Sequence, residues 1–235
     1  MARRANPAFA AGAVLVPVAA LGGAILTSDL RPLFYVHVMA GVLWTGIDVF
    51  MGAVLGPVLG GLSVDERASV FERFTPKMTF LMPTLAAVTI GGGITLATEL
   101  GKFPHADPWL AIMTGAVLLP VVPLIAVQFG AVRDRRTALA FLLALGVSAP
   151  ALALTAPEFA WTTREMLLVL GIVTLLSVLG FGVILPGEVR IYRELGSADP
   201  DTETISTVGM RNARLSGVQG LLQLGIVAAM VLLRF

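Results

Sequence analysis

The chain has 235 residues, of which 57% are hydrophobic and only 13% are charged. Soluble domains carry about 25% charged residues, so too few polar side chains remain here to cover a soluble globule. The composition also excludes a disordered protein, a nucleic-acid-binding protein and a disulfide-stapled secreted module. The net charge of +1 indicates no particular partner, and the absence of cysteine excludes thiolate metal sites and thiol redox chemistry.

Seven stretches are long and apolar enough for a spanning helix, which needs about 20 mostly apolar residues. Their residues do not alternate between apolar and polar as the strands of a membrane β-barrel do. The sequence therefore predicts an all-α, polytopic transmembrane helix bundle that forms a single transmembrane domain over residues 1–235. We place the seven spans at about 8–27, 33–57, 78–98, 109–130, 137–156, 165–186 and 214–233.

The first span follows Arg3 and Arg4, but its apolar run is longer than that of a signal peptide, so we expect it to remain as a helix. Twelve of the sixteen Lys and Arg residues lie on one side of the predicted membrane. Because cytoplasmic loops carry the excess of positive charge, we expect the N-terminus inside and the C-terminus outside. The protein is then a multi-pass protein of the cell (plasma) membrane with a lipid bilayer as its surroundings.

Two long inner loops contain further patterns. Residues 62–77 begin with the capping-box sequence Ser63-Val64-Asp65-Glu66 and predict a short amphipathic helix at the inner membrane interface. A gate or a partner-docking helix is the alternative. In the loop 187–213, the charged residues from Glu188 to Glu194 predict a helical extension of the sixth span.

A weak internal repeat relates the second and sixth spans. Both predicted spans end close to a Gly and a Pro, and both lead through a long inner loop into another span. Aligning Pro57 with Pro186 sets His37 against Met166.

Chemistry, if present, is expected on the second span, because ionisable residues inside a membrane are costly and indicate function. At about 100° per residue, five of its residues fall on one face, and we call them the His37–Asp48 stripe. A lipid-facing stripe of this kind would be costly, so we expect it to face the bundle interior and to offer Asp48 and Trp44 as an ion or proton path. The stripe consists of His37, Gly41, Trp44, Asp48 and Met51.

A structural interpretation of the same residues remains open. A protonated Asp48 could hydrogen-bond a glutamine of another span, namely Gln128, Gln219 or Gln223. His37 could make a structural hydrogen bond instead of binding a ligand. Small residues along the second span, Gly46, Gly52, Gly56 and Gly60, are expected to pack against neighbouring helices.

Copper and haem are the two candidate ligands. Imidazole and thioether groups suit Cu(I), and His37, His105 and Met166 are all expected in the outer half of the molecule. A bis-imidazole haem needs two histidines on facing helices, whereas this chain offers one within the spans. His37 could therefore serve a haem b alone, or together with His105 or Met166.

The stretch from His37 to Leu96 resembles the CopD-type copper-resistance integral membrane proteins and, more distantly, the HemJ-type protoporphyrinogen oxidases. The resemblance rests on His37, Trp44 and Gly46, on Gly56-Pro57, and on Phe74-Thr75-Pro76 followed by Thr89 and a glycine run. It implies that His37 is the histidine next to the metal or haem, with Trp44 and Gly46 packing the site. The CopD-type resemblance implies passage of copper across the membrane, and the HemJ-type resemblance implies a b-type haem.

Three hypotheses follow from the sequence. The first is a permease-like protein that moves copper or another small ion, with His37 as the outer ligand and Asp48 at mid-depth. The second is a haem-binding membrane redox protein with His37 as the axial ligand. The third is a non-catalytic scaffold or complex subunit that binds a membrane-protein partner or forms a homo-oligomer.

Overall fold

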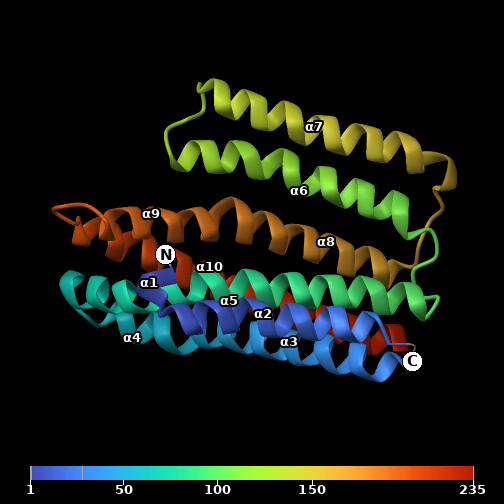
Figure 1. The fold of residues 1–235 in the computed structure, drawn as a ribbon, viewed down its shortest axis with the longest axis horizontal. Coiled ribbons are helices and arrows are strands. Elements are labelled where there is room, and N and C mark those ends of the chain that lie inside the picture. Colours follow the sequence, from blue (N-terminus) through green and yellow to red (C-terminus); the bar gives the residue numbers. More distant parts are fainter. Residues whose placement is uncertain (1, 28, 235) are drawn as a thin grey trace. The chain divides into compact units, whose positions relative to one another are not determined.

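A computed structural model describes residues 2–27 and 29–234, and every regular element in these ranges is helical (Figure 1). Seven of its helical runs are long and apolar enough to cross a membrane, which confirms the predicted multi-pass helical architecture. The elements are α1 (Ala2–Ala5), α2 (Pro7–Ile25), α3 (Leu30–Phe50), the π-helical η1 (Met51–Leu55), α4 (Gly56–Gly60), α5 (Val64–Glu99), α6 (Ala106–Gln128), α7 (Arg135–Thr155), the 3-10 helix η2 (Ala156–Glu158), α8 (Arg164–Leu179), the π-helical η3 (Gly180–Ile184), α9 (Leu185–Leu195) and α10 (Thr202–Arg234).

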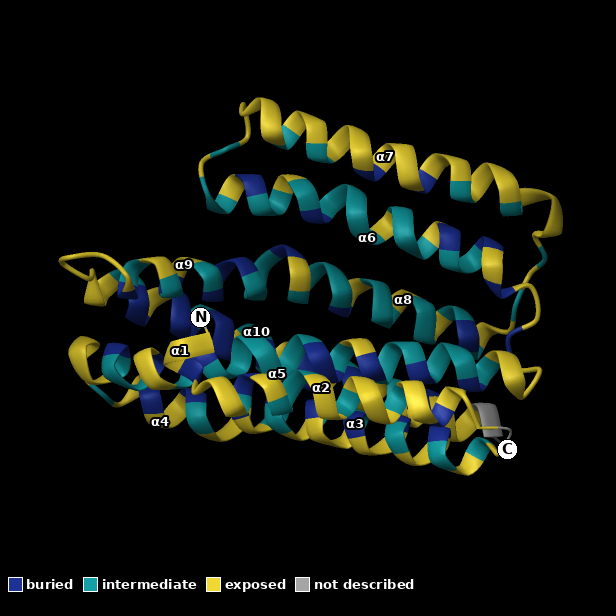
Figure 2. Ribbon diagram, viewed as in Figure 1, coloured by how far each residue is buried: buried dark blue, intermediate teal, exposed yellow. Residues whose placement is uncertain are grey.

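Much of the length of these helices is exposed (Figure 2), and many of the exposed residues are large and hydrophobic. On α7, Leu142 and Leu143 are 63% and 61% exposed, and on α2, Leu15 and Val16 are 64% and 68% exposed. Exposed apolar surface of this extent would be unfavourable in water. It is the surface that a lipid bilayer covers, so the burial pattern agrees with the composition.

The chain forms two compact units. Unit 1 comprises residues 1–99 and 187–221, and unit 2 comprises residues 100–186 and 222–235. In unit 1, α2, α3 and α5 pack pairwise against one another. One apolar cluster, around Leu33 and Leu96, joins the ends of these three helices, and a second, around Phe71 and Ile191, joins α4, α5, α9 and α10.

The segment from residue 62 to 77 differs from the expected separate interfacial helix. The capping box is present, because Ser63 N–H donates to Glu66 at 2.8 Å and Glu66 N–H donates back to the Ser63 hydroxyl at 3.4 Å. The helix that starts there continues through Pro76 and Pro83 to Glu99 as the single helix α5. Its apolar face, with Phe71 only 2% exposed, packs on protein rather than lipid because Gly209 of α10 accommodates the Phe71 ring.

Unit 2 is built on α6, which packs against both α7 and α8. At the start of α6, the indole of Trp109 donates to the carbonyl of Ala160 at 3.0 Å. Its ring also lies 5.2 Å from Phe159 and 6.0 Å from Trp161 between centroids. Tryptophans concentrate at membrane–water interfaces, so this aromatic cluster is consistent with an interfacial position for this end of unit 2.

Two spans contain a π-helical break at the same distance from a proline. The π segment η1 begins six residues before Pro57, and η3 begins six residues before Pro186. In each case an N–H bonds five residues back, from Gly56 to Met51 and from Leu185 to Gly180. Since proline cannot donate the normal helical hydrogen bond, a π turn is one way to accommodate it, and the shared geometry supports the weak repeat.

The expected glycine packing is concentrated at one position of the second span. A Cβ added to Gly52 would lie 2.3 Å from the Cα of Gly217 on α10, so the two backbones are in direct contact. A Cβ on Gly56 would meet only a carbonyl of its own helix. Gly46 and Gly60, contrary to expectation, have no atom within 4 Å of an added Cβ and lie on exposed helix surface of the described chain.

We predict that Gly52→Ala lowers the free energy of unfolding by about 1–3 kcal/mol, because a methyl group would overpack the contact with α10. Gly46→Ala, one turn and a half earlier on the same span, is the matched control. It adds a methyl group in open space and should be neutral or stabilising by about 0.5–1 kcal/mol, since alanine favours helix over glycine. Thermal unfolding of the purified protein in detergent measures both changes, and equal melting temperatures would contradict the contact.

Candidate functional site

The His37–Asp48 stripe faces the interior of unit 1, as expected. His37 is 8% exposed, Trp44 and Met51 are each 7% exposed, and Asp48 is fully buried. Gly41 lies against Thr89 of α5, where an added Cβ would be 3.3 Å from the threonine methyl group. The stripe thus runs along the surface of α3 that packs on its neighbours within the unit.

Asp48 lies where α3 and α10 pack closely against each other. A Cβ added to Gly220 would stand 2.8 Å from the backbone nitrogen of Val49 and 3.1 Å from the carbonyl carbon of Asp48. One turn away on α10, Gly217 touches Gly52 of the second span. Two glycines of α10 therefore let this helix lie directly on the backbone that carries Asp48.

The face of α10 in this region is polar although it is buried. Four of its polar residues recur with helical spacing and are each no more than 8% exposed, namely Asn212, Ser216, Gln219 and Gln223. Buried polar groups need hydrogen-bonding partners, so a polar helix face is the environment that a buried carboxylate requires. Gln128, another expected partner for Asp48, donates to the carbonyls of Gly182 and Val183 in the π segment η3, at 2.8 and 3.2 Å.

A second buried carboxylate belongs to the same site. Glu188 lies on α9, is 9% exposed and interacts electrostatically with Asp48. Its carboxyl group is within hydrogen-bonding reach of Thr79 on α5. We call Asp48 and Glu188 the carboxylate pair.

The sequence pattern predicts Glu188 only as part of a charged helical extension of the sixth span, outside the predicted site. Pro186-Gly187 resembles a helix end, but Pro186 occupies the second position of α9, where proline is tolerated. A signal for burial was present, because Glu188, Ile191 and Leu195 share one helix face. Both apolar residues of this face are buried.

Backbone carbonyls near the carboxylate pair lack their usual helical donors. Pro83 has no N–H for the carbonyl of Thr79 four residues before it. The η1 break begins three residues after Asp48, and the η3 break ends four residues before Glu188. Broken helices in membrane proteins often line cavities or ion sites with such carbonyls, and π turns occur frequently at functional sites.

His37 is held in a defined orientation between α3 and α5. Its Nδ1 lies 2.8 Å from the carbonyl oxygen of Thr89, to which it donates, so Nε2 is the acceptor nitrogen. A Cβ added to Gly93 would lie 2.9 Å from Cε1 of the ring, and one added to Gly92 would lie 3.2 Å from the His37 Cβ. Metal-binding histidines usually donate their second N–H in this way, so the geometry suits a ligand at Nε2.

A haem is less well matched by the same contacts. The space that the glycines of α5 create is filled by the imidazole of His37 itself, which lies directly on the helix backbone at Gly93. A porphyrin bound at Nε2 would have to lie alongside this helix surface. The residues present therefore fit a small ligand better than a haem.

His105 and Met166, the other two predicted ligands, lie in a different unit from His37. Both belong to unit 2, whereas His37 belongs to unit 1. His105 is exposed in the turn before α6 with a left-handed φ of 56°, and Met166 is 4% exposed in the first turn of α8. Within the described residues, no three His, Cys, Asp or Glu side chains form a group that could hold a metal ion.

We predict that Gly93→Ala lowers the free energy of unfolding by about 1–3 kcal/mol, because the added methyl group would overlap the His37 imidazole. Gly91→Ala in the same glycine run is the matched control. Its Cβ would make only an ordinary contact, 3.7 Å from Leu21, and should not destabilise. Thermal unfolding in detergent distinguishes the two, and a stable Gly93→Ala protein would show that the imidazole lies elsewhere.

Comparison of the chain with models of protein families, with curated proteins and with solved structures returned no match.

Proposed function

We propose that this protein moves copper or another small cation across the plasma membrane. The observation that carries the proposal is the carboxylate pair, with Asp48 and Glu188 both buried in unit 1 and electrostatically coupled. Two like charges in a medium of low dielectric constant repel one another and are stabilised by a cation or a proton between them. A site that is lowered in energy by a passing cation is what a cation pathway needs inside a membrane.

The stripe on α3 supplies a route toward the pair. His37 presents its Nε2 at one end, Trp44 follows, and Asp48 lies about 16 Å further along the helix axis. In the proposed mechanism His37 is the entry ligand and the carboxylate pair is the central station. Copper is named first because the sequence resembles CopD-type proteins and because the imidazole of His37 suits Cu(I). The carboxylates and carbonyls of the site also accept harder cations.

The two alternatives make different demands on the same residues. A haem protein needs His37 and does not need the carboxylate pair. A scaffold or complex subunit needs neither the imidazole of His37 nor the carboxylate pair for its function. A transport assay combined with an absorbance spectrum of the purified protein therefore separates the three.

We predict that Asp48→Asn and Glu188→Gln each reduce the initial rate of cation uptake into proteoliposomes to below about a tenth of the unmodified rate. This loss corresponds to a barrier higher by about 1.4 kcal/mol, because an amide cannot stabilise the cation as a carboxylate does. Dyes inside the vesicles that respond to copper and to protons identify which cation moves.

Matched controls are Asp65→Asn and Glu99→Gln, which make the same chemical changes at exposed positions of α5 and should leave the rate unchanged. Uptake by Asp48→Asn at the unmodified rate would exclude the proposed path. A Soret band that disappears in His37→Ala would favour the haem alternative instead.

The proposed orientation has the N-terminus inside and the C-terminus outside. Because the chain contains no cysteine, a single introduced cysteine reports one position without background. We predict that Lys102→Cys reacts with a membrane-impermeant maleimide in intact cells and that Ser197→Cys reacts only after lysis. Both residues are exposed in loops, and the reverse result would invert the topology.

A further inference from the structure

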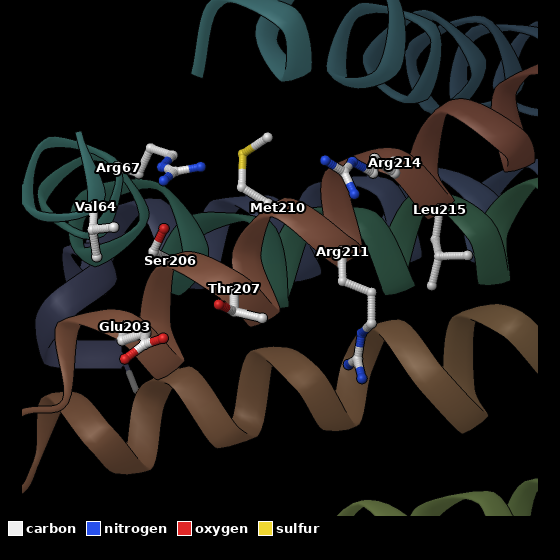
Figure 3. Close-up of a pocket in the computed structure, with 9 residues that line it drawn as sticks. All are labelled: Val64, Arg67, Glu203, Ser206, Thr207, Met210, Arg211, Arg214 and Leu215. Carbon is white, nitrogen blue, oxygen red and sulfur yellow. The ribbon is translucent and has the colours of Figure 1, made fainter. Parts of the chain in front are cut away.

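A cavity of about 680 Å³ lies in unit 1 where α5 and α10 begin (Figure 3). Its lining includes Arg67 from α5 and a series of residues from α10, among them Arg211 and Arg214. Figure 3 shows Arg67 and Arg214 extending on one side of α10 with Met210 between them, whereas Arg211 extends toward α9. Neither Asp48 nor Glu188 lines the cavity, and the proposed cation path makes no use of it.

The charge of this cavity is positive. Three arginines line it against a single carboxylate, that of Glu203. The charge of Arg190 on α9 also acts on Arg211, which raises the positive potential further. Ser206 and Thr207 add hydroxyl groups to the lining.

Arg67 offers a hydrogen-bond donor to the cavity. Its side chain is half-buried, and its Nε is buried with no hydrogen-bond partner in the described chain. Leaving a buried charged donor unsatisfied is costly. Neither Arg67 nor Arg214 has an ion-pair partner among the described residues, so an acceptor from outside the chain would satisfy both.

We propose that this cavity binds a phosphate group between Arg67 of α5 and Arg214 of α10. Guanidinium groups bind phosphate oxygens through paired, charge-assisted hydrogen bonds. The volume lies within the range of about 300–1,000 Å³ that is usual for small-ligand pockets. The phosphate can come from an acidic lipid headgroup or from a soluble phosphate ester, and basic pockets between spanning helices on the cytoplasmic side commonly take lipid headgroups.

Native mass spectrometry of the full chain in detergent tests this site with three probes, namely a short-chain phosphatidylglycerol, glycerol phosphate and a short-chain phosphatidylcholine. We expect phosphatidylglycerol to bind more tightly than phosphatidylcholine. Arg67→Gln and Arg214→Gln should each weaken that binding about tenfold or more, since a hydrogen bond to a charged group is lost. Arg67→Lys should recover only part of the affinity, because it keeps the charge and loses the paired geometry.

Arg73→Gln is the matched control. This arginine is exposed on α5 and donates to Ser69 at 2.9 Å, so its loss should not change the affinity. Arg-dependent binding of glycerol phosphate rather than of lipid would support the site with a soluble ligand. Equal affinity of the unmodified protein and of Arg214→Gln for every probe would overturn the proposal, and because Arg214 is exposed this variant should fold normally.

Discussion

The backbones of η1 and α10 touch at Gly52 and Gly217, where neither residue has room for a side chain. This contact brings α10 directly onto the second span within unit 1. It places the face of α10 that carries Ser216 and Gln219 directly beside the part of α3 that carries Asp48. A carboxylate at this depth would be too costly against lipid, and the glycine contact both excludes lipid and brings a polar helix face into its place.

Backbone hydrogen bonding imposes a second constraint that acts together with the first. In a bilayer every N–H and C=O group must be satisfied within the protein, yet both spans that carry the carboxylate pair contain a proline and a π turn. In η3 the side chain of Gln128 supplies the missing donor to the Gly182 carbonyl, four residues before Pro186. The breaks are therefore tolerated parts of the fold, and in the sequence they fall three residues after Asp48 and four residues before Glu188.

The spans and the His37–Asp48 stripe could be predicted because both depend on local patterns. Continuous apolar runs identify helices that lipid can cover, and the helical period places His37, Trp44 and Asp48 on one face whatever lies opposite. The prediction was less accurate where a segment depends on its partner. Residues 64–77 have the pattern of an interfacial helix, but α9 and α10 cover its apolar face and make it the first part of α5.

For Glu188 and for the glycines of the second span, too, the sequence does not show which segment packs against them. A carboxylate after Pro186-Gly187 resembles a loop residue until the packing of Ile191 and Leu195 shows that its face is buried. Gly46, Gly52 and Gly60 are equivalent in sequence, and only the position of Gly217 makes Gly52 the contact. The sequence by itself determined the membrane class, the seven spans and the face on which Asp48 lies, because hydropathy and helical period are properties of a single segment. Only the tertiary structure decided that Glu188 joins Asp48, because the pairing of two faces far apart in the chain depends on which backbones can approach each other.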